Sequence, residues 1–142
     1  MQPFEWDEKF SVHIPQMDAQ HRQIIELLDA FRKCAQSSES RQLAPAAMEP
    51  LNQYAQRHLR REELMLRIRG YSEYAAHAAE HAVYLKKVAL LQAQLERRDI
   101  SIRITNFLTG WWKYHMLHSD QEYARFFRGQ AIAVTSTARP AA

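Results

Sequence analysis

Apolar residues recur every three to four positions along most of the chain, which is the spacing of one face of an α-helix. Four such segments follow the N-terminal region: about 18–37, from 45 or 51 to 70, 73–98, and from 101 onwards. Glycines are few, and the alternation typical of strands is rare. The pattern predicts an all-α protein, and the short connections predict an up-down-up-down four-helix bundle.

Capping residues predict where these helices begin and end. Asp18 is expected to cap the first helix. The second helix is expected to begin near Pro45 or after Pro50, because proline is tolerated in a first turn but not in an interior. Gly70 is expected to end it. Residues 119–128 are predicted to form a short C-terminal helix.

The two ends of the chain differ from the central segments. Residues 1–17 contain two prolines among aromatic residues and predict an extended arm that packs along the bundle. Alternation from Phe4 to Ile14 would also fit a short strand, but a lone strand has no partner here. Residues 129–142 are small, polar and proline-containing, and predict a flexible tail. One domain in residues 1–128 is therefore expected.

Composition and charge exclude several classes of protein. The 142 residues carry a net charge of +3 with scattered basic residues, so a nucleic-acid-binding surface is not expected. Cys34 is the only cysteine, which excludes an intramolecular disulfide and fits a reducing compartment. The N-terminus lacks a signal-peptide pattern, and no apolar stretch is long enough for a membrane span. A cytoplasmic protein is expected.

Histidine spacing gives the first chemical signal. His77 and His81 lie four residues apart, so a helix would place both imidazoles on one face, where they can bind one metal ion. His58 and Glu62 share this spacing on the preceding segment. Each pair also has a simpler interpretation. The first could be half-buried histidines bonded to backbone or water, and the second a His–Glu hydrogen bond.

The signal strengthens when the segments are taken together. His21 and His115 also lie on apolar faces, although each alone would be interpreted as a structural histidine. Five histidines directed into one small core would leave many nitrogens without partners, whereas one dinuclear metal site would satisfy them. Imidazole with few carboxylates suits iron, copper or zinc. The lack of a cysteine set argues against structural zinc or an iron–sulfur cluster.

The sequence resembles the hemerythrin family, in its single-domain bacterial type, over about residues 4–127. The resemblance rests on the motifs Trp6 with Phe10-Ser-Val, Met17-Asp-Ala-Gln-His21, Tyr54-x3-His58-x3-Glu62-Glu63, Gly70-Tyr71, His77-x3-His81 and Trp111-x3-His115-x4-Asp120. Together they are highly specific, because seven ligand positions match in order and spacing.

The resemblance implies a cofactor of two non-haem iron ions with an oxo or hydroxo bridge. The ligands that it implies are His77, His81 and His115 at one iron, His21 and His58 at the other, and the bridging carboxylates Glu62 and Asp120. The implied oxygen pocket, beside the iron with two histidines, is lined by Ile24, Leu59, Trp111 and Leu117.

The function implied by the resemblance is reversible dioxygen binding, as an oxygen carrier, store or delivery protein rather than an enzyme. A histidine-rich site also holds less negative charge than a carboxylate-rich one, which favours the reduced metal over oxidation catalysis. The alternatives are a di-iron enzyme that reduces peroxide or nitric oxide, an iron-storage protein and an oxygen sensor. Dioxygen is the expected partner, with an oxygen-consuming enzyme as a candidate recipient, and a monomer is expected.

Three residues complicate this interpretation. On a straight helix His118 lies about 60° from His115, whereas Asp120 lies about 140° away, so spacing alone selects His118 as the ligand. The resemblance selects Asp120, which requires a kink near residues 115–117, and His118 is then an exposed bystander. His13 stands where the family often has glycine, and is interpreted as arm or surface packing. Trp112 stands where leucine is frequent, and would narrow the pocket if it faces the bundle.

Overall fold

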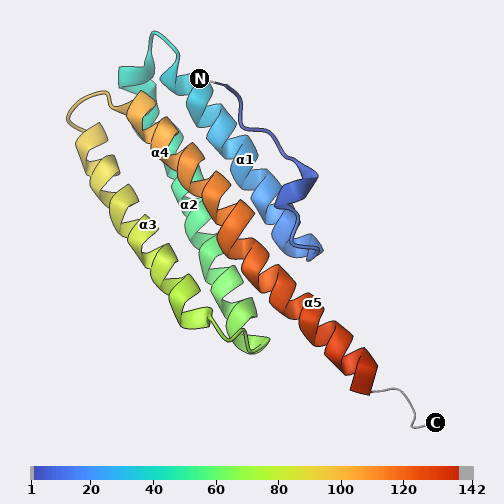
Figure 1. The fold of residues 1–142 in the computed structure, drawn as a ribbon. Helices are drawn as coiled ribbons and strands as arrows, with labels where there is room; N and C mark the ends of the chain where they lie inside the picture. Colours follow the sequence, from blue (N-terminus) through green and yellow to red (C-terminus); the bar gives the residue numbers. More distant parts are fainter. Residues whose placement is uncertain (1, 138–142) are drawn as a thin grey trace.

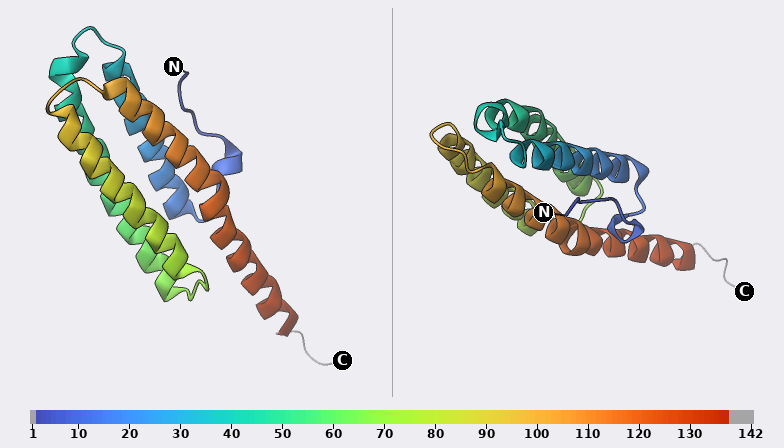
Figure 2. Two further views of the ribbon diagram at one scale, coloured as in Figure 1. Left: turned by 60° about the vertical axis from the view of Figure 1, so that its left-hand side comes forward. Right: turned by 90° about the horizontal axis from the view of Figure 1, so that it is seen from above.

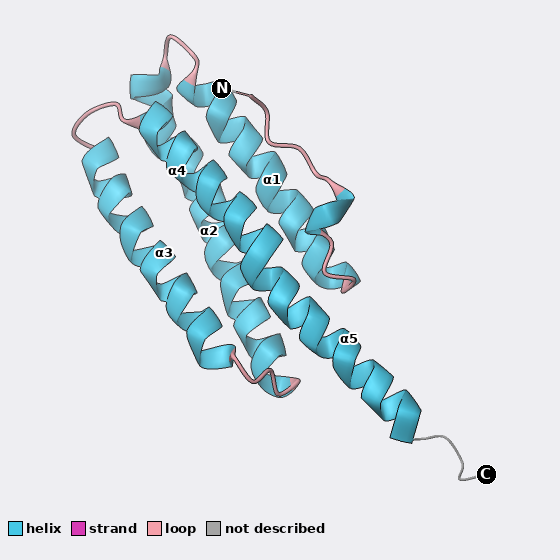
Figure 3. Ribbon diagram, viewed as in Figure 1, coloured by secondary structure: helices cyan, strands magenta, loops and turns pink. Residues whose placement is uncertain are grey.

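The structure is a computed structural model that describes residues 2–137. Within that range all regular structure is helical, and no strand is formed (Figures 1 and 3). The elements are a 3-10 turn at Glu8–Phe10, α1 (Pro15–Ala35), α2 (Ser40–Ile68), α3 (Tyr74–Leu95), α4 (Ser101–Tyr114), a π-helical turn at His115–Ser119, and α5 (Asp120–Thr137). The predicted all-α four-helix bundle is confirmed, and α4, the π-helical turn and α5 form one continuous rod (Figure 1).

The first helix begins three residues earlier than its predicted cap. Pro15 occupies the first turn of α1, where its fixed φ suits a helix and its missing N–H costs nothing. Asp18 therefore does not cap the helix. Its carboxylate accepts hydrogen bonds from Ser11 Oγ at 2.5 Å and from the backbone N–H of Val12 at 2.9 Å. The carboxylate that was expected to start the helix instead fastens the N-terminal arm to it.

The second helix begins at Ser40 and runs through Pro45 and Pro50, so the predicted start was wrong. Each internal proline removes one backbone N–H from the helix. Met48 and Leu51 are fully buried on this stretch, and burying such a side chain contributes about 1.5–3 kcal/mol. Packing against the rest of the bundle thus outweighs the local preference of proline.

The N-terminal arm lies against the bundle, as predicted. Phe4, Phe10 and Val12 are buried, and the arm runs beside α1 and α4 (Figures 1 and 2). Its single regular element is the 3-10 turn, and the alternative of a short strand is not realised in the described residues. These three apolar side chains of the arm therefore belong to the buried core.

The C-terminal helix is longer than the expected short piece at residues 119–128. α5 passes Gly129, where the tail was predicted to begin, and continues to Thr137; residues 138–142 lie outside the described residues. It projects beyond the other helices (Figure 1). Among the described residues, no helix is both long and apolar enough to cross a membrane.

Two clusters of buried side chains leave room for polar groups between them. The larger includes Leu59 and Trp112 between the four helices, and the smaller includes Tyr71 and Tyr123 near the start of α5. Histidine rings contact both clusters: His58 lies 5.9 Å from Trp112, and His77 lies 5.6 Å from Tyr123, measured between ring centroids. The polar centre described next is therefore enclosed by apolar side chains on two sides.

Candidate metal centre

The bundle brings all seven predicted ligand residues together, and all are at most 5% exposed. They come from α1, α2, α3, α5 and the π-helical turn: His21 on α1, His58 and Glu62 on α2, His77 and His81 on α3, His115 on the turn, and Asp120 at the start of α5. Since these elements direct their ligands to one interior point, the cluster depends on the tertiary fold.

Glu62 lies at the junction of two ligand groups. One group contains Glu62 with His77, His81 and His115, and the other contains Glu62 with His21 and His58. Within each group the candidate ligand atoms lie within 4.8 Å of one another. The Glu62 carboxylate is 2.7 Å from Nε2 of His77 and 3.6 Å from Nε2 of His21. One carboxylate thus reaches both groups.

Asp120 is placed as a second shared carboxylate. Its Oδ1 lies 3.1 Å from Nε2 of His115, and its Oδ2 lies 3.2 Å from Nε2 of His21. The two oxygens therefore point toward opposite ends of the cluster. With Glu62, this gives two carboxylates between a set of three histidines and a set of two.

Several atoms of the cluster are buried and form no hydrogen bond of good geometry, although some lie within ion-pair distance of one another. They are both ring nitrogens of His21, Nε2 of His58 and both carboxylate oxygens of Asp120. Leaving polar atoms buried and unpaired is costly, and native proteins seldom do so. Imidazole nitrogens and carboxylate oxygens that converge in this way form a suitable donor set for a pair of metal ions. The residues present therefore fit a dinuclear metal site.

The π-helical turn explains how Asp120 reaches the cluster. The backbone N–H of Asp120 donates to the carbonyl of His115, five residues earlier, which is the π-helical pattern. This wider turn brings residues 115 and 120 onto one side of the rod. His118 is exposed, with its ring 4.5 Å from the ring of Tyr114. In this structure Asp120, and not His118, faces the other ligand residues.

The sequence did not reveal the side chains that bind the Nδ1 atoms of three of the histidines. The Nδ1 contacts are His58 with Gln20 Oε1 at 2.7 Å, His81 with Glu63 Oε2 at 3.1 Å, and His115 with Glu80 Oε1 at 2.8 Å. Such partners fix the tautomer and orientation of a ligand histidine and raise its basicity. Each partner directly flanks a ligand residue in the sequence, but faces a neighbouring helix and so serves a different ligand. Their position next to a ligand residue is the sequence feature by which these partners could have been identified.

Tyr123, which the sequence did not indicate as part of the site, contacts the carboxylate of Glu62. Tyr123 is fully buried and donates a hydrogen bond to Oε2 of Glu62 at 3.0 Å. Burial, together with the nearby charges of Glu62 and Asp120, raises the pKa of the Tyr123 phenol well above its ordinary value. The phenol therefore keeps its proton and remains a donor to Glu62.

The two neighbouring tryptophans contact the cluster in different ways. Trp111 stacks on the ring of His115 with a centroid separation of 4.4 Å and is partly buried. Trp112 is fully buried, lies 5.9 Å from the His58 ring, and donates from Nε1 to the hydroxyl of Tyr84 at 3.0 Å. The Trp112 ring also lies 6.1 Å from the His115 ring, so Trp112 faces the interior between the two sets of histidines, whereas Trp111 lies against the set of three.

The other residues named in the sequence analysis are placed as follows. Ile24 and Leu59 are fully buried in the larger core. Leu117 is partly buried and borders a surface pocket with Phe4 and Phe10 of the arm. His13 is exposed and has a φ of 59°, a conformation that favours glycine.

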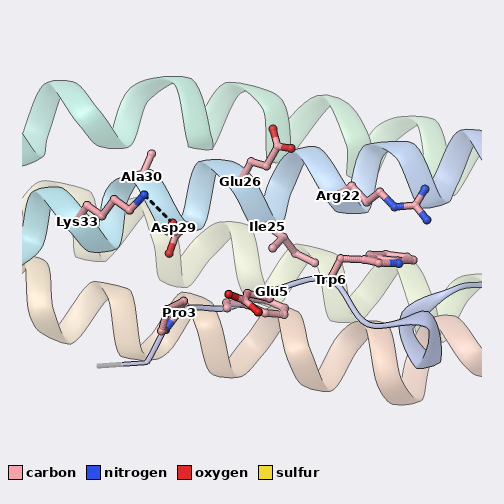
Figure 4. Close-up of a pocket in the computed structure, with 10 residues that line it drawn as sticks. Pro3, Glu5, Trp6, Arg22, Ile25, Glu26, Asp29, Ala30 and Lys33 are labelled. Carbon is pink, nitrogen blue, oxygen red and sulfur yellow. Dashed lines mark ion pairs between the residues drawn. The ribbon is translucent and has the colours of Figure 1, made fainter.

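Two surface cavities differ in whether residues of the candidate centre line them. The larger, about 510 Å³, lies between the arm and the outer face of α1, among Trp6, Arg22 and Ile25 (Figure 4). No residue of the candidate centre lines it. A smaller pocket of about 200 Å³ is lined by His77 and Glu80. Of these two cavities, only the smaller reaches a residue of the centre.

Charges within the cluster stabilise one another without metal. Burial opposes a charge on His21 and His77, but pairing with Asp120 and Glu62 prevails and raises each pKa to about 9. Burial also opposes a charge on Glu62 and Asp120, but the surrounding histidines hold both pKa values below their ordinary range. His58 differs, because burial lowers its pKa. Metal binding must therefore displace protons from some of these histidines.

The metal-free protein is expected to lose stability as the pH rises from about 6.5 through 9. The raised pKa values of His21 and His77 add stability that is fully present below pH 6.5 and is lost as the pH passes about 9. The lowered pKa values of Glu62 and Asp120 act at the acid end, where stability is lost as the pH falls below their ordinary values. Urea denaturation with a chelator present measures both effects.

We expect the free energy of unfolding of the metal-free protein to be lower at about pH 9.5 than at about pH 6, by about 1–3 kcal/mol. An unfolding free energy of the metal-free protein that does not decrease between about pH 6 and pH 9.5 would contradict the charge distribution described here.

The chain matches the model of the family described as "Hemerythrin HHE cation binding domain" over residues 12–127. It is 32% identical over 120 residues to a bacteriohemerythrin of Stenotrophomonas maltophilia, covering 84% of this chain and 78% of that protein. It is 25% identical over 126 residues to a bacteriohemerythrin of Clostridium acetobutylicum, covering 84% of this chain and 98% of that protein. A crystal structure of wild-type hemerythrin superimposes with a TM-score of 0.81 at 24% identity, covering 87% and 97% of the two chains.

These matches confirm the resemblance and the bundle that the sequence predicted. The matched region contains all seven residues of the candidate centre. The chain belongs to the hemerythrin family.

Proposed function

We propose that this protein binds dioxygen reversibly at a non-haem di-iron centre and acts as an oxygen carrier, store or delivery protein. The observation that carries the proposal is the enclosed set of five histidines and two shared carboxylates, several of whose atoms form no hydrogen bond within the protein. Membership of the hemerythrin family supports iron as the metal. When bound there, a pair of ferrous ions would supply the two electrons needed for reversible dioxygen binding.

The ligand sets differ at the two ends of the centre. We assign His77, His81 and His115 to one iron and His21 and His58 to the other, with Glu62 and Asp120 shared between them. The protein offers one ligand fewer at the end with two histidines, so that end is where an external ligand has room to bind. An oxo or hydroxo bridge would complete the centre.

The surrounding side chains perform three tasks in this proposal. Trp112, Leu59 and Ile24 are fully buried in the larger core, with Trp112 beside His58, and exclude water from the centre. Gln20, Glu63 and Glu80 orient the histidines by accepting from Nδ1. Tyr123 orients Glu62 by donating its phenolic proton to Oε2. The second and third tasks preserve the orientation of the ligand side chains.

The finer parts of the proposal extend the expectations drawn from the sequence and from the family resemblance. We place the di-iron bundle in residues 1–128, treat the protein as a cytoplasmic monomer, and regard an oxygen-consuming enzyme as the recipient of dioxygen. Carriage rather than catalysis is supported by the small number of carboxylates among the ligands. A peroxide or nitric oxide reductase would instead show steady turnover with an electron donor.

Iron stoichiometry and turnover together test this proposal. The iron-loaded protein should hold two iron ions per chain and should not consume peroxide or nitric oxide catalytically. A much larger iron content would indicate storage, and sustained consumption of either substrate would indicate an enzyme. The absence of stoichiometric iron after loading under anaerobic conditions would show that the bundle is not a metal centre.

Trp112 is expected to restrict access to the end with two histidines. Because its indole lies 5.9 Å from His58, Trp112→Leu should open space there and accelerate azide binding to the iron-loaded protein by ~10-fold or more. Stopped-flow absorbance measures the rate. Trp111→Leu is the matched control, since Trp111 stacks on His115 at the opposite end. A larger acceleration in Trp111→Leu would show that Trp111 forms the pocket, as the sequence predicted.

A further inference from the structure

We propose that Gln121 is a positioning residue that holds the π-helical turn in place and thereby sets the direction of Asp120. The inference uses the assignment of Asp120 as a ligand in the proposed function. It adds that this ligand depends on a side chain that itself contacts no metal, and on the N-terminal arm to which that side chain is bonded.

The π-helical turn needs a stabilising contact because it is an unfavourable local structure. π-helical segments are rare, and they disturb the regular hydrogen bonding of the surrounding helix. In a regular α-helix the N–H of Asp120 would donate to the carbonyl of Met116, four residues earlier. Here it donates to the carbonyl of His115 instead. The carbonyl of Met116 therefore loses its ordinary α-helical donor.

Gln121 supplies a replacement donor. Its side-chain nitrogen Nε2 lies 3.2 Å from the carbonyl oxygen of Met116. Met116 is fully buried, so its backbone has limited access to water as an alternative donor. The side-chain amide of the residue directly after Asp120 thus compensates for the bond that the wider turn removes.

The same amide fastens the turn to the N-terminal arm. Nε2 of Gln121 lies 3.1 Å from the carbonyl oxygen of Ser11, and an amide nitrogen carries two hydrogens, so both contacts can be satisfied together. Asp18 holds the arm from its other side through Ser11 Oγ and the N–H of Val12. The carbonyls of Lys9 and Phe10 lie slightly farther from the amide, at 3.3 and 3.4 Å. The arm therefore provides a fixed support for the turn.

Loss of this support would move the ligand. If the turn relaxed to a regular α-helix, Asp120 would be rotated about 140° from His115, and His118 would take the direction of the centre. The centre would then lose the carboxylate that reaches both ligand groups. Gln121→Met removes both N–H donors while keeping the length of the side chain, and so tests this dependence.

The first measurement uses the metal-free protein. Backbone amide hydrogen exchange at residues 117–121 should be ~10-fold faster or more in Gln121→Met than in the wild type, because the turn opens more often. Gln53→Met is the matched control, since Gln53 is an exposed glutamine whose side-chain amide donates to Glu49 on the same helix. Unchanged exchange at these amides would overturn the inference. This measurement stands even if the proposed function fails.

The second measurement uses Co²⁺ as the metal probe, in competition with a chelator. Gln121→Met should weaken Co²⁺ binding by ~10–100-fold, the usual effect of removing an outer partner of a ligand. In an Asp120→Ala background the same substitution should cause almost no further loss, because Gln121 acts through Asp120. A full additional loss in the double variant would show a general structural role and contradict the inference.

Two further outcomes are distinguishable. If the wild type itself takes up no pair of Co²⁺ ions, the proposed function fails, while the exchange measurement still decides the role of Gln121. If Gln121→Met does not fold, Gln121→Asn serves in its place, because it keeps the amide but withdraws it by one methylene. Retained Co²⁺ affinity and slow exchange in Gln121→Asn would then overturn the inference.

Discussion

Replacement of Glu62 by glutamine is expected to abolish binding of the metal pair. The carboxylate of Glu62 belongs to both ligand groups and lies within 3.6 Å of a nitrogen of each of the five histidines. An amide has a similar shape, but it carries no charge and offers one good acceptor in place of two. Iron content after anaerobic loading should fall from two ions per chain to less than one.

The control for this substitution is Glu49→Gln, an exposed glutamate on the same helix whose contact is with Gln53. It should leave the iron content unchanged. A Glu62→Gln protein that folds and still retains two tightly bound iron ions would show that Glu62 does not join the two groups.

Replacement of Asp120 by alanine is expected to have the second largest effect. The substitution removes the carboxylate between His115 and His21, so affinity for the metal pair should fall by ~100-fold or more. His118→Ala, made three residues from the same ligand histidine, should change the affinity little because its side chain is exposed. Chelator competition measures both affinities on proteins of matched helical content.

The reverse result would contradict the structure. If His118→Ala released the metal and Asp120→Ala did not, the π-helical turn would be absent in solution and the regular α-helix would hold the ligand. The pair of variants therefore tests the backbone of this segment as well as the identity of the seventh ligand.

The sequence predicted most of the candidate centre because histidine spacing is a local property of helices. His77 with His81, and His58 with Glu62, occupy one face at i,i+4, and the structure places each pair in the interior. Spacing alone could not show that the four segments converge on one point, since that depends on packing. The family motifs supplied this information, and the enclosed cluster agrees with them.

The predictions that failed were decided by tertiary contacts. Pro45 and Pro50 were expected near a helix start, but the buried face of α2 outweighs the two lost N–H groups. Aspartate is a favoured N-cap residue, yet the carboxylate of Asp18 accepts hydrogen bonds from the N-terminal arm. In the first case a local preference was outweighed by packing against other helices, and in the second by hydrogen bonds to residues six and seven positions earlier in the chain.

The periodicity of a regular α-helix could not predict that Asp120 faces the cluster. A period of 3.6 residues selects His118, and only a π-helical turn brings Asp120 to the cluster. The family pattern selected Asp120, the residue that faces the cluster in the structure, without giving the cause. The structure suggests a cause in the bonds of Gln121 to the turn and to the arm, which join residues more than a hundred positions apart.

The central claim is that the enclosed ligands hold a di-iron pair that binds dioxygen reversibly, and an absorbance cycle tests it most directly. Protein loaded with ferrous iron under anaerobic conditions should be nearly colourless. It should gain a visible band on exposure to air, lose that band on removal of oxygen, and regain it over repeated cycles. A protein that carries two iron ions per chain but shows no visible change with oxygen, or a change that cannot be reversed, would contradict the account.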